Sequence, residues 1–170
     1  MRLDRTREHF VRLLNEGEAP FDRSCFVPGH ITASGVVLDP TRTKCLLVHH
    51  PFLHRWLQPG GHLEPGDLDA AAAARREIVE ETGVTLTETS SCPLVGLDIH
   101  TIPERGGVPS HGHYDMTFLF TAASAELNPT HEVTSVAWCA VDDVQRYGVD
   151  EPFRRSVARA LGSVTPSARS

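Results

Sequence analysis

The sequence predicts an α/β sandwich in which a mixed β-sheet carries helices on its faces. β-Rich segments lie both before and after one helical segment rich in alanine, arginine and glutamate, and a loop rich in glycine and proline leads into that segment. Strands on both sides of a central helix are typical of mixed α/β domains. The 170 residues fit one such domain, which would bury about two-thirds of the surface of the unfolded chain.

The N-terminal segment predicts an amphipathic helix over residues 2–16, because apolar residues recur there near helical spacing with charges between them. Gly17 is expected to end this helix, and an irregular linker follows. We therefore expect residues 1–28 to form an N-terminal helix and linker, residues 29–162 to form the main domain, and residues 163–170 to form a flexible tail.

The first half of the main domain predicts a β-hairpin, a loop and a helix. β-Branched and apolar residues indicate the strands, proline and glycine indicate the loop, and strong helix formers followed by a glycine indicate the helix. The predicted elements are strands at residues 31–39 and 44–50, a loop at 51–67, and a helix at 69–82 ended by Gly83.

The second half of the domain predicts three more strands and two more helices. Alternating apolar residues indicate the strands, and the last helix is amphipathic. The predicted elements are strands at residues 92–102, 113–122 and 134–141, a short helix at 142–148, and a longer helix at 151–162.

Composition and charge exclude several classes of protein. With 16 basic and 22 acidic residues the net charge is −6, so no overall positive field favours binding to a nucleic acid duplex. No apolar run approaches the roughly 20 residues of a membrane span. The charged start, MRLDRTREHF, lacks the apolar segment of a signal peptide, so the expected location is the cytoplasm. The four cysteines are widely spaced and are expected to be reduced thiols, not a disulfide scaffold or a zinc finger.

Three glutamates on the predicted central helix are the strongest functional signal. Glu77, Glu80 and Glu81 are spaced i, i+3 and i+4, so their carboxylates share one face of the helix. Like charges at this spacing destabilise a helix unless a cation lies among them. Carboxylate and carbonyl oxygens are hard donors that suit Mg²⁺ or Mn²⁺. The alternative is a solvated acidic face that pairs with Arg75 and Arg76.

The segment around these glutamates resembles the signature of the Nudix hydrolase family. That signature is Gly, five residues, Glu, seven residues, then Arg-Glu-hydrophobic-x-Glu-Glu-x-Gly-hydrophobic. The chain has the pair Gly60-Gly61, then five residues, Asp67, eight residues, and the string Arg76–Val84, which matches at every defined position. The order of the flanking strands over residues 31–141 also resembles the family.

The two departures from the signature concern the loop before the helix. Asp67 replaces the glutamate that buttresses this loop in the family, and it is one methylene shorter. Glu64 is an alternative for that role. Either Asp67 or Asp69 can cap the N-terminus of the helix, where a carboxylate is favourable.

The resemblance implies a metal-dependent hydrolase that cleaves a diphosphate linkage in a nucleoside diphosphate derivative. Its implied partner is a small nucleotide-type substrate, and its implied cofactor is Mg²⁺ or Mn²⁺. Such an ion neutralises the diphosphate and lowers the pKa of a bound water. The implied metal ligands are the carbonyl of Gly60 and the side chains of Glu77, Glu80 and Glu81.

Four residues are candidate catalytic residues. By the same resemblance, Arg76 would orient the glutamates by ion pairing, and Glu80 would act through the metal. One carboxylate must take a proton from the attacking water. Glu77 on the helix and Glu132 in the loop before the last strand are both candidates for this general base.

Four further residues are candidate substrate contacts. Trp56 can stack on a base or pack beneath the loop, and Arg55 can meet a phosphate or remain a solvated loop charge. His113 and Asp115 can line a pocket near the metals. Alternatively, strand alternation merely places these two on the opposite face from Met116 and its apolar neighbours.

Three other functions compete with this interpretation. The first is a dinuclear zinc hydrolase. Residues 111–115, HGHYD, resemble part of the histidine string of the metallo-β-lactamase fold, but Met116 stands where the last histidine should be. An isopentenyl-diphosphate isomerase of this fold uses a cysteine near the pocket, and no cysteine lies between His49 and Ser91. A non-catalytic nucleotide-ligand sensor usually loses signature glutamates, and all three are kept here.

Overall fold

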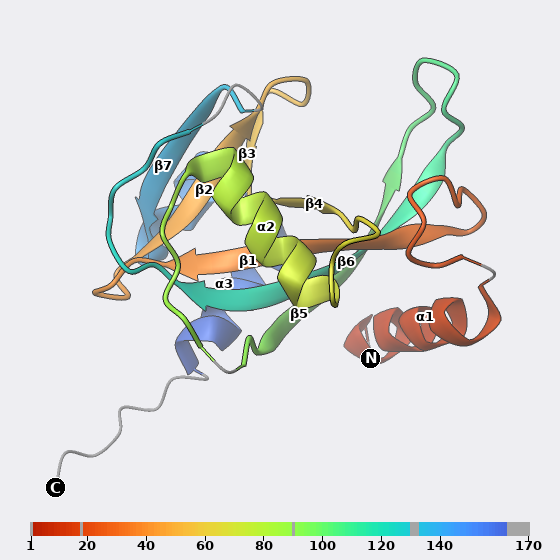
Figure 1. Ribbon diagram of the computed structural model, residues 1–170, viewed down its shortest axis with the longest axis horizontal. Helices are drawn as coiled ribbons and strands as arrows, with labels where there is room; N and C mark the ends of the chain where they lie inside the picture. The colour runs from red at the N-terminus through yellow and green to blue at the C-terminus, as the bar shows by residue number, and fades with distance from the viewer. Residues whose placement is uncertain (1, 18, 90, 130–132, 163–170) are drawn as a thin grey trace, which may run out of the picture.

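The computed structural model describes residues 2–17, 19–89, 91–129 and 133–162, with the backbone alone at residues 2–4 (Figure 1). The predicted tail, 163–170, lies outside these residues. The helices are α1 (Arg2–Glu16), α2 (Ala70–Thr82) and α3 (Glu151–Gly162), with the 3₁₀ helix η1 (Val141–Tyr147). The strands are β1 (Gly29–Leu38), β2 (Lys44–His50), β3 (Arg55–Leu57), β4 (Gly60–His62), β5 (Leu94–Ile102), β6 (His111–Thr121) and β7 (Ser135–Ala140).

The described strands form one seven-stranded mixed sheet around β1. β1 runs parallel to β6 along its whole length, from Gly29 beside Gly112 to Leu38 beside Thr121. Its other edge pairs antiparallel with β4 and, at Leu38, with β2. β5 extends the sheet beyond β6, while β3 and β7 lie on either side of β2. A parallel central pair among antiparallel neighbours confirms the predicted mixed sheet.

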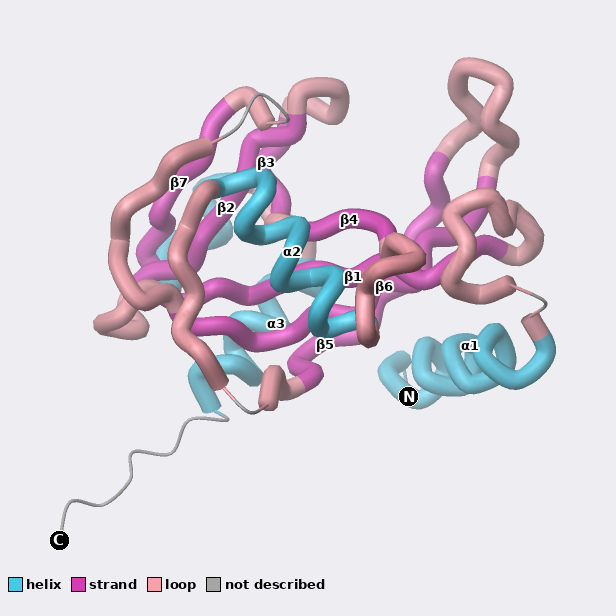
Figure 2. The backbone as a smooth tube through the Cα atoms, in the orientation of Figure 1, coloured by secondary structure: helices cyan, strands magenta, loops and turns pink. Residues whose placement is uncertain are grey.

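Helices cover both faces of the sheet, which confirms the predicted α/β/α sandwich (Figures 1 and 2). Residues that alternate along β1 point to opposite faces. On one face, Val37 packs with Ile78 of α2, and Ile31 packs with Phe10 of α1. On the other face, Val36 packs with Phe153 of α3. All ten residues of β1 are buried, because both faces of this strand are covered.

The segment predicted as a loop at residues 51–67 contains two short strands, β3 and β4. Each has three residues, too few for hydrophobic alternation to show, and β4 begins with two glycines. Tertiary pairing creates β4, because Gly60 to His62 align with Ser34 to Thr32 of β1. This pairing fixes the two glycines in the sheet beside β1.

The ends of α2 are set by its capping residues, as the sequence predicts. Asp69 is the N-cap, and its carboxylate accepts a hydrogen bond of 2.8 Å from the backbone N–H of Ala72. At the other end, Gly83 adopts the left-handed conformation with φ of 64°, and its N–H donates to the carbonyl of Val79. The two caps fix where the helix that carries the three glutamates begins and ends.

All four cysteines, each within the described chain, are free thiols, as predicted. Cys45 and Cys139 are buried opposite each other on β2 and β7. Burial raises the pKa of the Cys45 thiol to about 12. In the part of the chain that the structure describes, no helix combines the length and apolarity needed to cross a membrane.

Candidate active site

α2 presents its glutamates at the edge of the face that packs on the sheet. Ala73, Ala74, Ile78 and Thr82 form the buried face of this helix. Glu77 lies beside that face, with 17 % of its side chain exposed, while Glu80 projects further outward with 49 % exposed. Glu81 is half-buried. The three carboxylates share one side of α2, as the helical spacing predicts, and Glu80 is the most exposed of them.

β4 lies directly against these carboxylates, and a side chain at Gly61 would displace the nearest of them. A Cβ added to Gly61 would lie 2.6 Å from the carboxyl carbon of Glu77 and 2.7 Å from both of its oxygens. The N–H of Gly60 donates a hydrogen bond of 3.0 Å to Oε2 of Glu81. The backbone of Gly60 and Gly61 therefore lies in direct contact with the carboxylates of Glu81 and Glu77. Carboxylate side chains together with a backbone carbonyl offer oxygen donors, which fit a hard cation such as Mg²⁺ or Mn²⁺.

Arg76 connects the glutamates to the loop before the helix. Its Nη1 donates to Oε1 of Glu77 at 3.1 Å and to Oε2 of Glu80 at 3.0 Å. Its Nη2 donates to the carbonyl of His62 at 2.9 Å. Nε and Nη2 both bind the carboxylate of Asp67, at 3.1 and 3.0 Å. Asp67 and the carbonyl of His62 fix the orientation of the guanidinium, so its Nη1 can orient the carboxylates of Glu77 and Glu80.

Asp67 is long enough to hold the loop, which resolves the choice between it and Glu64. Its side chain is only 8 % exposed and also accepts a 2.8 Å hydrogen bond from the N–H of Glu64. The hydrogen bonds from Arg76 hold the pKa of Asp67 below its usual range. The side chain of Glu64 is 64 % exposed and lies 3.9 Å from Arg76. The ion pair that locks the loop is therefore that of Asp67.

Trp56 packs against β2 and η1 on the α3 side of the sheet. Its ring makes edge contacts with His49 and with Tyr147 of η1, each with centroids 5.3 Å apart, and it covers the core on the α3 side. Arg55 is exposed at the start of β3. Contact of either residue with substrate stays a prediction.

Asp115 lies inside the sheet layer, with 5 % of its surface exposed. Its oxygens accept hydrogen bonds from Ser34 at 2.6 Å, from Thr32 at 3.1 Å and from Thr117 at 3.2 Å. Burial raises the pKa of this carboxyl. Met116 packs on the α1 and α2 side, so the predicted alternation of β6 is confirmed. A substrate contact by Asp115 stays a prediction.

His113 belongs to a group of histidines that come from several strands. His30 stands beside it on β1 and His100 beside it on β5, as the strand register requires. His62 of β4 and His111 of β6 also lie with ring centroids 5.1 Å from that of His113. Burial lowers the pKa of His113 to about 3. His30 and His100 join this group through strand pairing, which the sequence pattern does not indicate.

Glu132, the loop candidate for the general base, lies outside the described residues. Glu77 is the candidate that the structure places, against Gly61 and in an ion pair with Arg76. Its role as the base stays a prediction.

Comparison with known folds and families gives one consistent result. The model of the NUDIX domain matches residues 29–161. No curated protein sequence matches the chain significantly. A Nudix-family hydrolase from Clostridium perfringens superposes with a TM-score of 0.58 at 24 % identity, covering 80 % of this chain and 98 % of that one. The Ap4A hydrolase of C. elegans gives 0.57 at 20 % identity, covering 78 % and 96 %.

A third neighbour is the dihydroneopterin triphosphate pyrophosphohydrolase of E. coli, with a TM-score of 0.55 at 15 % identity over 79 % of this chain and 96 % of that one. At these identities the solved structures show a shared fold. The domain match spans most of the chain and includes β4, the capped helix α2 and its three glutamates. The chain belongs to the Nudix family of phosphoanhydride hydrolases.

Proposed function

We propose that the protein is a divalent-metal-dependent hydrolase that cleaves a diphosphate linkage in a small nucleotide-type molecule by attack of water on phosphorus. The observation that carries this proposal is the contact between Gly61 and the carboxylate of Glu77, where a Cβ would come within 2.6 Å. A backbone strand in this close contact with a carboxylate brings peptide groups beside an acidic helix face, and a hard cation takes oxygen ligands from both kinds of group.

The residues of the site have two tasks in this proposal, metal binding and the positioning of the metal ligands. The carbonyl of Gly60 and the side chains of Glu77, Glu80 and Glu81 would hold Mg²⁺ or Mn²⁺. A bound ion would supply charge neutralisation for the diphosphate and a water of lowered pKa. Arg76 keeps two of the carboxylates in place, since it donates to both Glu77 and Glu80.

The substrate class rests on the family and on the names of structural neighbours. An Ap4A hydrolase and a dihydroneopterin triphosphate pyrophosphohydrolase share this fold, and both names denote hydrolysis of a small phosphorylated molecule. Nudix membership likewise supports a small-molecule substrate. A nucleoside diphosphate derivative is the form of this class that we propose.

Metal dependence is the first test of the proposal. A panel of nucleoside diphosphate derivatives is incubated with the protein and Mg²⁺, Mn²⁺, Ca²⁺ or excess chelator, and the products are separated by chromatography. We expect hydrolysis with Mg²⁺ or Mn²⁺, little with Ca²⁺ because its looser coordination positions water poorly, and none with chelator. Full turnover in excess chelator would contradict the proposed chemistry. Tight binding of a panel member without turnover under any metal would favour a ligand sensor.

The two candidates for the general base can be ranked by substitution. We expect Glu77→Gln to lower turnover more than Glu132→Gln and to weaken Mg²⁺ binding as well, because Glu77 would be both ligand and base. Turnover and Mg²⁺ affinity are measured for both variants under the same conditions. If Glu132→Gln loses more turnover while Mg²⁺ binding is unchanged, the loop carboxylate is the base.

A further inference from the structure

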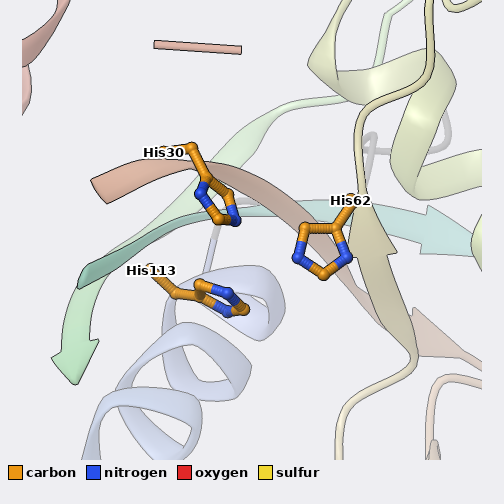
Figure 3. Close-up of side chains that lie close together, drawn as sticks. All are labelled: His30, His62 and His113. Carbon is orange, nitrogen blue, oxygen red and sulfur yellow. The ribbon is translucent and has the colours of Figure 1, made fainter. Parts of the chain in front are cut away.

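Three histidines from three different strands point toward one another on the α3 side of the sheet (Figure 3). His30 lies on β1, His62 on β4 and His113 on β6. One ring nitrogen from each can be chosen so that the three atoms all lie within 4.8 Å of one another. The ring centroids are 4.8 to 5.1 Å apart. The strand register creates this arrangement, because His30 is paired with His113 and His62 with Thr32, two residues along β1.

His30 provides an independent sign that a ligand belongs here. The residue is 1 % exposed, and its Nδ1 lies 2.9 Å from the carbonyl oxygen of Cys25. A carbonyl can only accept, so Nδ1 carries the proton and Nε2 has a free lone pair. Among the described side chains, Nε2 of His30 is the buried polar atom without a hydrogen-bond partner. A buried lone pair without a donor is costly unless another group, such as a metal ion, binds to it.

The hydrogen bond to Cys25 is also the kind that prepares a histidine for metal binding. A histidine that ligates a metal through one nitrogen usually donates its other N–H to a carboxylate or a backbone carbonyl. His111 has the same kind of hydrogen bond, since its Nδ1 lies 2.7 Å from the carbonyl oxygen of Pro109. Its Nε2 is 3.3 Å from Nε2 of His113, so a fourth imidazole stands beside the three.

We propose that His30, His62 and His113 form a site for a borderline divalent metal ion such as Zn²⁺, separate from the carboxylate site on α2. Imidazole nitrogen suits Zn²⁺ and its transition-metal neighbours, whereas Mg²⁺ prefers oxygen. In a tetrahedral zinc site the ligand nitrogens lie roughly 3.4 Å apart, so modest ring rotations close the remaining gap. Three histidine ligands leave a fourth position for His111, water or another molecule.

The two sites are separated by the alternation of β4. Gly61 faces the carboxylate of Glu77 on α2, and the side chain of the next residue, His62, points to the other face of the sheet. The zinc site therefore shares no ligand with the carboxylate site on α2. Zinc binding can be tested independently of the proposed hydrolase activity.

The test is a titration of the full chain, carrying no histidine tag, with Zn²⁺ by calorimetry in the presence of saturating Mg²⁺, which occupies the carboxylates. We expect one Zn²⁺ per chain. His62→Gln and His113→Gln should each weaken binding at least about tenfold, because each removes a ligand. His9→Gln, which alters an exposed histidine of α1, and Glu80→Gln, which alters the carboxylate site, should leave Zn²⁺ affinity unchanged.

A second measurement does not depend on the variants folding. In the wild-type chain, the ¹⁵N resonance of His30 Nε2 should shift on addition of Zn²⁺, while that of His9 should not. The proposal is overturned if the wild-type chain takes up no Zn²⁺ under saturating Mg²⁺. It is also overturned if both histidine variants bind Zn²⁺ as tightly as the wild-type chain, or if the His30 resonance does not move. In those cases the three histidines only pack against one another and do not bind a metal ion.

Discussion

Replacing either Glu80 or Glu81 by glutamine is expected to lower turnover roughly 100-fold or more while the fold stays intact. Glutamine keeps the shape of the side chain and removes its charge, so the cation loses one anionic ligand. Metal ions contribute several kcal/mol to stabilising the charge of a transition state, and each 1.4 kcal/mol is about tenfold in rate. The fold should survive, because the buried face of α2 consists of other residues.

Glu88→Gln is the matched control for this experiment. It makes the same chemical change on a glutamate whose side chain is 97 % exposed and whose neighbour is Arg75, outside the proposed site. Turnover at saturating Mg²⁺ and the melting temperature are measured for all three variants. Glu88→Gln should match the wild-type chain in both. Near-wild-type turnover in either Glu80→Gln or Glu81→Gln at saturating metal would show that the ligand assignment is wrong.

The predictable part of this site is the part carried by one helix. Glu77, Glu80 and Glu81 are close in space because the helical repeat makes them so, and Asp69 and Gly83 mark the helix ends by local chemistry. Such signals lie within a few residues of one another in the sequence. The positions of the longer strands along the chain could be predicted for the same reason, since each of them carries its own apolar pattern.

The parts that the sequence did not reveal depend on pairing between distant segments. β4 exists because Gly60 to His62 align with β1, and two glycines carry no apolar signal. The choice between Asp67 and Glu64 required the position of Arg76, which is folded back onto the loop. The histidine group required the register of β1, β4 and β6 together, because its members come from positions 30, 62 and 113.

Gly61→Ala is expected to lower turnover on the order of 100-fold with little change in stability. The added Cβ would lie 2.6 to 2.7 Å from the carboxyl atoms of Glu77, so this carboxylate must move. A displacement of about 1 Å at a catalytic group costs on the order of 100-fold. The clashing atoms are the end of a flexible side chain, so the backbone can stay in place. Gly60→Ala, in contrast, should lower stability. The φ of Gly60 is 152°, and an added Cβ would lie 2.5 Å from the backbone of β1, which cannot move as a side chain can.

Gly66→Ala is the control for this substitution, in the same loop and with the same added methyl group. A Cβ at Gly66 would have no neighbour within 4 Å, so turnover and melting temperature should both stay at their wild-type values. Mg²⁺ affinity is measured alongside turnover, since a displaced Glu77 should weaken both. If Gly61→Ala keeps full turnover and full Mg²⁺ affinity, the close approach of β4 to Glu77 has no part in the chemistry, and the site must be sought elsewhere on α2. A loss of turnover with unchanged metal affinity would instead assign Glu77 to proton transfer, because the carboxylate would then be displaced from the water and not from the ion.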